Sequence, residues 1–375
     1  MEIVASQTPE QRGALARIKL VYERYERFLM SGAFLLGFII DNLTLTRIDR
    51  VIDNAILTGY LSIATTSIIL WGMYIAGKFQ STFFRTIGRR LPYVIQFCFG
   101  ALFSGFIVFY SRSGSLIANW PFFALLALLF LGNEGLRKHY ERLTFQVLIL
   151  FTTIFLYSIF VLPIITGSIG AGMFIASGIV SLFVIHRIIW ILFRVGPDGF
   201  KENRALLWLG VISIFSALNF LYFTNMIPPL PLSLKEIGVY HNVTKVGDSY
   251  ILDRESRSAV SWLFKPVFHR VGNEPVYVYS SIFAPTRLST TISHEWSYFD
   301  ERSKKWISTG TIEFPINGGR DGGYRGYSIK ENAFPGRWRV NVSTSRGQLI
   351  GRIDFTIEQS VRPAPLRQNI QQFPL

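Results

Sequence analysis

The segment Asn225-Met226-Ile227-Pro228-Pro229-Leu230-Pro231 divides the chain into two parts of different composition. Residues 28–228 carry few charged side chains, whereas residues 230–375 have the composition of an ordinary soluble domain. Prolines this close together cannot continue a helix, and they make a stiff exit from one. We therefore expect a hydrophobic region that ends at this segment and a separate domain after it.

The hydrophobic part predicts membrane-spanning helices. A span needs about 20 mostly apolar residues, and the chain is 50% hydrophobic and only 17% charged. The apolar stretches also lack the polar face of a helix in a soluble protein. Asp41 and Asn42 interrupt the first stretch, and Trp120-Pro121 can break the start of the fourth, so either could be re-entrant. The seven expected spans are 28–45, 55–76, 91–110, 116–133, 143–164, 169–193 and 205–227.

The Lys and Arg residues predict the orientation. Sixteen of them lie before the first expected span, in every second loop after it and, for Arg187, near the end of the sixth span, whereas the alternate loops hold three. Because basic loops tend to stay cytoplasmic, we expect the N-terminus inside and, with seven spans, the C-terminal domain outside. The net charge of +14 does not predict nucleic-acid binding, because these residues form no single dense patch.

After the prolines, the hydrophobic pattern changes to a period of two. Trp338, Val340 and Val342 alternate with polar residues, and Val276–Phe283 is rich in β-branched and aromatic residues. Such segments, separated by turn signals such as Pro335-Gly336, predict strands in an antiparallel β-sandwich. The expected fold is an α-helical polytopic membrane domain followed by an all-β antiparallel sandwich. Its expected parts are a cytoplasmic segment (1–27), the membrane domain (28–227), a proline-rich spacer (228–235), an extracytoplasmic sandwich (236–360) and a C-terminal tail (361–375).

Short motifs follow one another through the β region in a fixed order. They are Glu274-Pro275, Val276-Tyr277-Val278-Tyr279, Ala284-Pro285, His294-Glu295-Trp296, Gly318-Gly319-Arg320, Pro335-Gly336-Arg337-Trp338-Arg339-Val340 and Gly351-Arg352. This order resembles the uncharacterised bacterial family known as domain of unknown function 2914, over roughly residues 265–358. In the hydrophobic half, residues 37–54 resemble the first span and following segment of bacterial membrane proteins that carry this domain. The resemblance implies a bacterial inner-membrane setting and no particular activity.

A polar cluster at the outer end of the first expected hairpin has two interpretations. Two carboxylates four residues apart on one helical face could hold a hard cation or a polar head group. Alternatively, Asp53 caps the second span and pairs with Arg50, which gives the cluster a purely structural role. Its members are Asp41, Arg47, Asp49, Arg50 and Asp53.

The arginines of the β region suggest a second site. Arginine recognises carboxylate and phosphate groups in a planar, bidentate way, so one polar sheet face could bind an acidic glycan or a lipid head group. The alternative is an ordinary solvated face. The residues concerned are Arg320, Arg325, Arg337, Arg339 and Arg352, with Trp306, Tyr324 and Tyr327 beside them.

No motif identifies a catalytic residue, a metal site or a cofactor. His294 and Trp296 share the apolar face of one strand, so we expect His294 to be a hydrogen-bonded core residue. The glycine-rich segment 318–323 joins two expected strands. A phosphate-binding loop needs a helix N-terminus behind it, so this segment is better explained as a hairpin turn.

Three functions fit these patterns. The first is an extracytoplasmic β module, anchored in the lipid bilayer, that binds an envelope glycan, a lipid head group or a protein partner. The second is a membrane enzyme that acts on a lipid-linked envelope precursor through Asp41, Asp49 and Asp53. The third, a transporter or its accessory subunit, is disfavoured because no inverted repeat or paired mid-membrane charges stand out.

Overall fold

A computed structural model describes most of the chain. The residues that it describes are 38–45, 50–79, 81, 86–116, 118–135, 142–247, 249–256, 265–285, 288–318 and 323–371. The chain forms two compact units, Met1–Thr46 and Arg47–Leu375. In the first unit, residues 38–44 are helical, and all elements described below belong to the second.

The first half of the second unit is helical. Among the described residues, five helices are long and apolar enough to cross a membrane. They are α2 (Val51–Ile75), α4 (Leu91–Ser113), α6 (Leu143–Thr166), α7 (Ala171–Val195) and α9 (Arg204–Phe223). Each coincides closely with an expected span.

The other two of the seven expected spans have different outcomes. Residues 28–37 of the first lie outside the described residues. The fourth is α5 (Trp120–Gly135), an apolar helix whose 16 residues make it shorter than the others. A further short helix, α8 (Asp198–Glu202), precedes α9.

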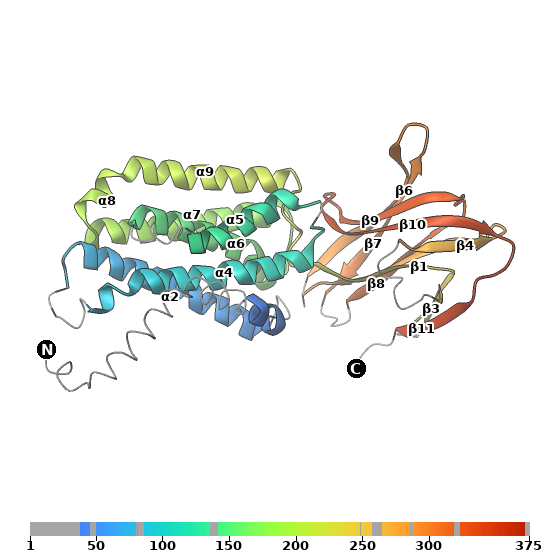
Figure 1. Ribbon diagram of the computed structural model, residues 1–375, viewed down its shortest axis with the longest axis horizontal. Helices are drawn as coiled ribbons and strands as arrows, with labels where there is room; N and C mark the ends of the chain where they lie inside the picture. The colour runs from blue at the N-terminus through green and yellow to red at the C-terminus, as the bar shows by residue number, and fades with distance from the viewer. Residues whose placement is uncertain are drawn as a thin grey trace, which may run out of the picture. The chain divides into compact units, whose positions relative to one another are not determined.

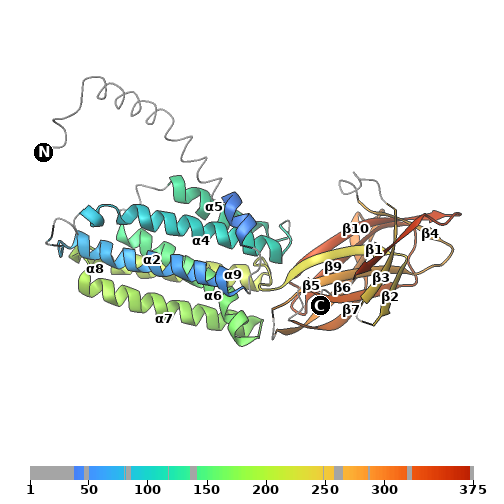
Figure 2. The same ribbon diagram turned by 90° about the horizontal axis from the view of Figure 1, so that it is seen from below.

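Aromatic side chains and internally bonded hydroxyls hold the helices together. In both Figure 1 and Figure 2, α2 and α4 run side by side, and they pack against each other. Phe160 of α6 makes edge-on ring contacts with Phe106 and Phe109 of α4. Thr58 of α2 and Tyr157 of α6 share a hydrogen bond of 2.6 Å between their hydroxyl oxygens. Because apolar surroundings offer no water, each buried hydroxyl needs such a partner within the protein.

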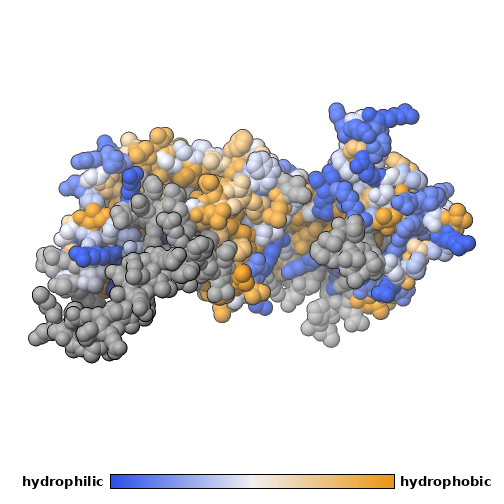
Figure 3. All heavy atoms as spheres, in the orientation of Figure 1, coloured by the Kyte–Doolittle hydropathy of each residue, from blue (hydrophilic) through white to orange (hydrophobic). Residues whose placement is uncertain are grey.

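The second half is built from strands. Figure 3 shows hydrophobic residues gathered over the helices on one face and hydrophilic residues over the strands. The strands are β1 (Ser233–Tyr240), β2 (Asn242–Val246), β3 (Ser249–Glu255), β4 (Val267–Val271), β5 (Val276–Phe283), β6 (Ser289–Asp300), β7 (Lys305–Asn317), β8 (Tyr324–Lys330), β9 (Gly336–Thr344), β10 (Leu349–Ser360) and β11 (Leu366–Gln371). β1 begins within the expected spacer, and β11 lies within the expected tail.

The strands form three sheets, in the orders β1-β5-β8, β4-β10-β9-β6-β7 and β11-β3-β2. Most pairs are antiparallel, as in β6–β9 and β9–β10. The expectation of wholly antiparallel strands is wrong at one edge, where β4 pairs with β10 in parallel. A parallel pair needs a long connection rather than a tight turn, and here almost the whole domain lies between the two strands.

One hydrophobic core joins the first two sheets. Val276 and Val278 come from the β1-β5-β8 sheet, whereas Trp296 and Trp338 come from the five-stranded sheet. The alternation that predicted β9 is confirmed, since Trp338, Val340 and Val342 are all buried. Packing of these inward faces is the main force available to hold the two sheets together.

The turn between β9 and β10 contacts the end of α9. The guanidinium carbon of Arg346 lies 4.5 Å from the ring centre of Tyr222. Asn225 Nδ2 donates to the carbonyl of Arg346 at 3.1 Å, and Gln348 Nε2 donates to the carbonyl of Ile227 at 3.4 Å. The chain that leaves α9 is therefore held by one side chain that precedes the prolines, Asn225, and by two that follow them in the sequence, Arg346 and Gln348.

Truncation of Trp338 tests the shared core. The side chain has 0% exposure and its Nε1 donates to the carbonyl of Phe334 at 2.8 Å. We expect Trp338→Ala to lower the free energy of unfolding by about 3–5 kcal/mol, measured by denaturant unfolding of the purified full chain. Trp306→Ala, on the outer face of the same sheet, is the control and should cost clearly less. Equal losses would contradict a core centred on Trp338.

Candidate functional site

The outer face of the five-stranded sheet carries stacked and paired arginines. Arg339 of β9 donates from Nε and Nη2 to the two carboxylate oxygens of Asp354 on β10, at 2.7 and 2.9 Å. Its guanidinium carbon also lies 4.0 Å from the ring centre of Trp306 on β7. Burial alone would raise the pKa of Asp354, but the hydrogen bonds and charge of Arg339 outweigh burial and lower it. Arg339 is thus occupied by partners within the domain.

Arg337 is occupied in the same way. Its Nε and Nη2 atoms donate to Oε1 of Glu301 at 3.0 and 2.7 Å. Its guanidinium carbon lies 3.7 Å from the ring centre of Phe299. Hydrogen bonds from Lys304 and Arg337 lower the pKa of the exposed Glu301 carboxylate. A ligand that used Arg337 or Arg339 would have to compete with a carboxylate already in place.

The residues predicted for this face do not all lie on it. The structure brings Trp306, Arg337 and Arg339 together through ring contacts with Phe299 and Trp306. Arg325 lies instead on β8 in the β1-β5-β8 sheet and is only 6% exposed. Arg320 lies outside the described residues. The single ligand-binding face expected from the sequence is therefore divided between two sheets.

A cavity of about 780 Å³ lies beside this face, between the end of α4 and the start of the β domain. Four basic residues line it: Arg112 of α4, Lys235 of β1, Lys265 just before β4, and Arg352 of β10. Asp354 is its acidic lining residue, and it is held by Arg339 and by Lys265, whose Nζ is 3.7 Å away. The walls also contain Ser111, Ser115 and Ser233 together with Leu234, Pro266, Ile350 and Ile353.

The shape and charge of this cavity have identifiable causes. A side chain on Gly351 would meet Leu234, and one on Gly114 would lie within 2.7 Å of Pro228, so both glycines permit close chain approach. Asn341 Oδ1 accepts a 2.7 Å hydrogen bond from Arg352 Nε and orients that guanidinium. Burial and the charge of Arg339 lower the pKa of Arg352. An anion in the cavity would offset this repulsion.

Sequence reasoning missed Arg112, Lys235 and Lys265 as site residues. Lys235 follows the proline segment by only four positions, and that closeness to the end of α9 was a usable signal. Lys265 had no such signal, because only the parallel pairing of β4 with β10 carries it beside Asp354.

The polar cluster at the start of α2 is described only in part. Arg47 and Asp49 lie outside the described residues, and the helical Asp41 belongs to the first unit. Arg50 occupies the N-cap of α2, while Asp53 lies in the first helical turn and is 3% exposed. The charge of Asp53 interacts with that of Arg112, which lines the cavity. A buried carboxylate whose charge interacts with that of an arginine in the neighbouring helix favours a structural role for Asp53.

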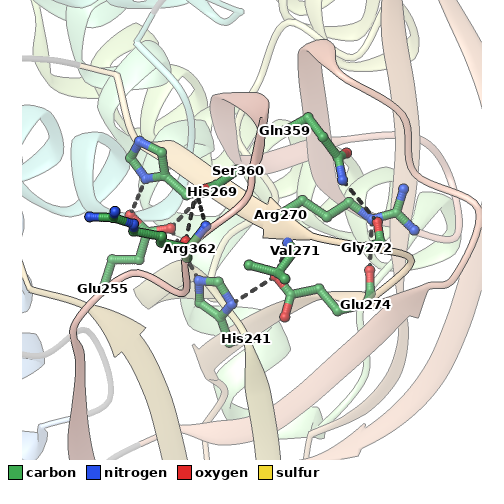
Figure 4. A network of polar contacts seen from close by, with 10 residues as sticks. All are labelled: His241, Glu255, His269, Arg270, Val271, Gly272, Glu274, Gln359, Ser360 and Arg362. Atoms are coloured by element: carbon green, nitrogen blue, oxygen red, sulfur yellow. Dashed lines mark hydrogen bonds and ion pairs between the residues drawn. The ribbon is translucent and has the colours of Figure 1, made fainter.

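A second polar cluster alternates carboxylates and imidazoles (Figure 4). His241 lies between two glutamates, with Nε2 3.1 Å from Glu255 Oε1 and Nδ1 3.3 Å from Glu274 Oε1. His269 Nδ1 lies 2.8 Å from the other oxygen of Glu255, and its Nε2 is 3.9 Å from Glu358 Oε2. The cluster connects residues at the ends of β1 and β3 with β4 and β10. Each sheet of the domain therefore contributes to it.

The charges of this cluster are mutually dependent. Burial alone would lower the pKa of His241, but hydrogen bonds and charge from Glu255 and Glu274 outweigh it and raise that pKa above 6.5. Burial would also raise the pKa of Glu255, yet the hydrogen bonds from the two histidines lower it to about 2. The described residues contain no group of three or more His, Cys, Asp or Glu side chains suited to hold a metal ion.

His294 is a core residue, as predicted. Its ring nitrogens lie 2.8 Å from Ser280 Oγ and 2.9 Å from Ser328 Oγ, inside the domain. Burial lowers its pKa to about 4, so the ring is neutral at ordinary pH.

The fold and its cavity define a class of protein: helices apolar enough to cross a membrane, followed by a β-rich domain with a basic cavity at their junction. Residues 289–357 match the family described as "Protein of unknown function (DUF2914)". The match lies in the C-terminal region where the sequence motifs predicted it.

Comparisons with other proteins add no argument about activity. A comparison with curated proteins found no match. A solved structure of Pseudomonas fluorescens alkylpurine DNA glycosylase AlkC bound to DNA containing an abasic site analog aligns over 84% of this chain and 100% of its own. Its identity is 8% and its TM-score 0.20, a likeness too low to carry an inference.

The His241 cluster predicts a pH-dependent stability. A raised imidazole pKa contributes stability that is fully present below pH 6.5 and is lost as pH rises through the folded pKa. The lowered pKa of Glu255 contributes stability that is lost as pH falls from 4.5 towards 2. We expect the difference in unfolding free energy between the natural chain and His241→Gln to shrink steadily above pH 6.5, measured by denaturant unfolding.

The control for this prediction is His186→Gln, because α7 carries no member of the cluster. Its unfolding curve should keep the pH dependence of the natural chain. A constant difference in unfolding free energy between the natural chain and His241→Gln at every pH from 5 to 9 would contradict a raised pKa for His241.

Proposed function

We propose that this protein is an integral membrane protein, of a bacterial inner membrane, that presents its β domain outside the cytoplasm as a binding module. The domain acts as a β-sandwich whose inward faces share the core around Trp338. Its ligand is an anionic component of the cell envelope. The observation that carries the proposal is the basic cavity between α4 and the β domain.

The distribution of charge supports the orientation. Lys78 follows α2 and donates from Nζ to the carbonyl of Arg194 at the end of α7, at 3.2 Å. The ends of these two helices therefore meet at a basic surface, where Arg142 lines a pocket together with Ile75 and Pro197. The β domain follows the opposite end of α9, next to the end of α4. Basic loops favour the cytoplasm, and the β domain is accordingly outside.

The charge of the cavity supports an anionic ligand. Four basic side chains line the cavity together with one carboxylate, that of Asp354. Asp354 also accepts hydrogen bonds from Arg339, and the charge of Arg112 also interacts with that of Asp53. Cations gathered in a partly desolvated cavity repel one another, and an anion that receives their hydrogen bonds relieves that cost. Asp53 is buried and its charge interacts with that of Arg112, which favours this binding role over an enzyme that uses the outer aspartates.

A reporter fusion tests the orientation. Alkaline phosphatase fused after Leu375 should be active, because this enzyme folds only outside the cytoplasm, and a fluorescent protein that folds only inside should stay dark. Fusions after Lys78, in a basic loop, are the matched control and should give the opposite pair of results. An inactive phosphatase fusion and a fluorescent fusion protein at Leu375 would overturn the proposed orientation.

Soluble anions test the binding role. At constant ionic strength, millimolar inorganic phosphate or glucuronate should raise the unfolding temperature of the detergent-purified full chain by about 2–4 °C, because ligands stabilise the state that they bind. The double variant Lys235→Gln, Arg352→Gln should lose this response.

The control removes the same charge elsewhere. Arg302→Gln with Lys304→Gln, in the turn between β6 and β7, should respond like the natural chain. If neither anion stabilises the natural chain, or if both double variants respond alike, the cavity is not an anion site.

A further inference from the structure

A second cavity lies among the helices, between the start of α6 and the start of α9. Its volume is about 730 Å³. We infer that it binds an anionic phospholipid, with an acyl chain in the cavity and the head group beside Arg142. This inference rests on the membrane placement in the proposed function and not on the ligand of the β domain.

One side of α9 forms a wall of this cavity. The residues of α9 that line it are spaced three and four positions apart, which places them on one side of the helix. They are Leu206, Leu209, Gly210 and Ser213. At 1.5 Å per residue this wall is about 10 Å long. An acyl chain can therefore lie along α9 within the cavity.

The facing walls are also largely apolar. Phe145 and Leu148 come from α6, and Ile75 comes from the end of α2. Phe200 of α8, the short helix that connects α7 to α9, lines the cavity as well. The helices α6 and α9 come close at Gly210, where an added Cβ would lie 2.7 Å from Leu148 Cδ2. The cavity is thus a recess between two packed helices.

The leucines of this recess need an apolar partner. Leu206 and Leu209 are each 61% exposed. Apolar side chains in contact with water are unfavourable, whereas lipid chains are as apolar as leucine itself. An acyl chain from the surrounding bilayer is therefore the occupant that suits these side chains.

The mouth of the cavity lies at the level of the lipid head groups. The helix α9 has 20 residues, or about 30 Å, which matches the hydrocarbon core of a bilayer. Its N-cap, Asn203, lines the cavity. At the same end of α7, the guanidinium carbon of Arg194 lies 3.5 Å from the ring centre of Trp190. Tryptophan and arginine are typical of the membrane interface.

Basic side chains gather at this mouth. Arg142, the N-cap of α6, lines the cavity and is exposed. Its guanidinium has no hydrogen-bond or ion-pair partner among the described residues. Lys78 follows the lining residue Ile75 by three positions, and its Nζ donates to the carbonyl of Arg194. An arginine at this place can hold a phosphate in a bidentate way.

The carboxylates of α8 do not occupy Arg142. Asp198 Oδ1 lies 2.7 Å from Nζ of Lys201, and Glu202 ends the helix. The positive ends of the α6 and α9 helix dipoles lie at the same mouth and add to the attraction for an anion. Basic pockets between membrane helices on the cytoplasmic side bind the head groups of anionic lipids.

The binding test uses the delipidated full chain in a neutral detergent, followed by native mass spectrometry. The probes are dioctanoyl phosphatidylglycerol and dioctanoyl phosphatidylcholine, which share their chains, and glycerol phosphate, which has no chain. We expect phosphatidylglycerol to bind about tenfold more tightly than phosphatidylcholine, because its head group keeps a net negative charge. Glycerol phosphate should bind at least about tenfold more weakly than phosphatidylglycerol, because it buries no apolar surface.

Two variants connect this binding to the cavity. Arg142→Gln removes the cation at the mouth and should weaken phosphatidylglycerol binding by about tenfold while leaving phosphatidylcholine binding unchanged. Gly199→Leu changes a lining position where an added Cβ meets nothing within 4 Å. The larger side chain fills part of the cavity and should weaken the binding of both lipids.

Matched controls make the same changes elsewhere. Arg90→Gln changes another exposed N-cap arginine, that of α4. Gly59→Leu adds the same side chain to α2, at a position where an added Cβ also meets nothing within 4 Å. Both controls should bind phosphatidylglycerol like the natural chain.

The outcomes separate this inference from the proposed function. Equal binding of the two lipids, or of phosphatidylglycerol and glycerol phosphate, overturns the inference. It also fails if Arg142→Gln and Gly199→Leu bind like their controls, or if only Lys235→Gln with Arg352→Gln abolishes binding, because the lipid then lies in the β-domain cavity. Phosphatidylglycerol binding that survives in this last double variant supports the inference, even where the anion test of the proposed function fails.

Discussion

The contact between the β9–β10 turn and the end of α9 is the interaction on which the rest of this protein depends. Arg346 lies over the ring of Tyr222, and Asn225 and Gln348 hydrogen-bond across the same place. Pro228 and Pro229 follow the end of α9 after four residues and limit the conformations open to the chain. Because β10 continues from this turn, the contact also sets where Arg352 and Asp354 lie relative to the end of α4.

This arrangement separates two kinds of basic residue. Arg337 and Arg339 stack on aromatic rings and form ion pairs with Glu301 and Asp354, so nearby carboxylates of the same domain balance their charges. The cavity instead collects cations from a helix end, from the first strand and from β10, opposite a single carboxylate that is already paired. Basic side chains from separate parts of the chain thus meet at this cavity.

Much of the candidate site could not be predicted from the sequence. Arg337 and Arg339 were recognisable because alternation along one strand places them on one face. Their carboxylate partners depend on strand register, which pairs Arg339 with Asp354 and Ser297 with Arg339. Arg325 was placed wrongly because alternation identifies a face but not the sheet to which a strand belongs. The cluster around Glu255 was missed for the same reason, since its members are far apart in the chain and meet only across sheets.

Three features follow from the amino-acid sequence alone: the division into an apolar helical part and a β-rich part, the positions of five long helices and the buried positions of β9. These features depend on local hydrophobic periodicity and on proline chemistry, which neighbouring residues express directly. The parallel pairing of β4 with β10, the ion pairs of Arg337 and Arg339 and the basic cavity are visible only in the folded chain. Those features arise from contacts between distant segments, and no local pattern records which segments will meet.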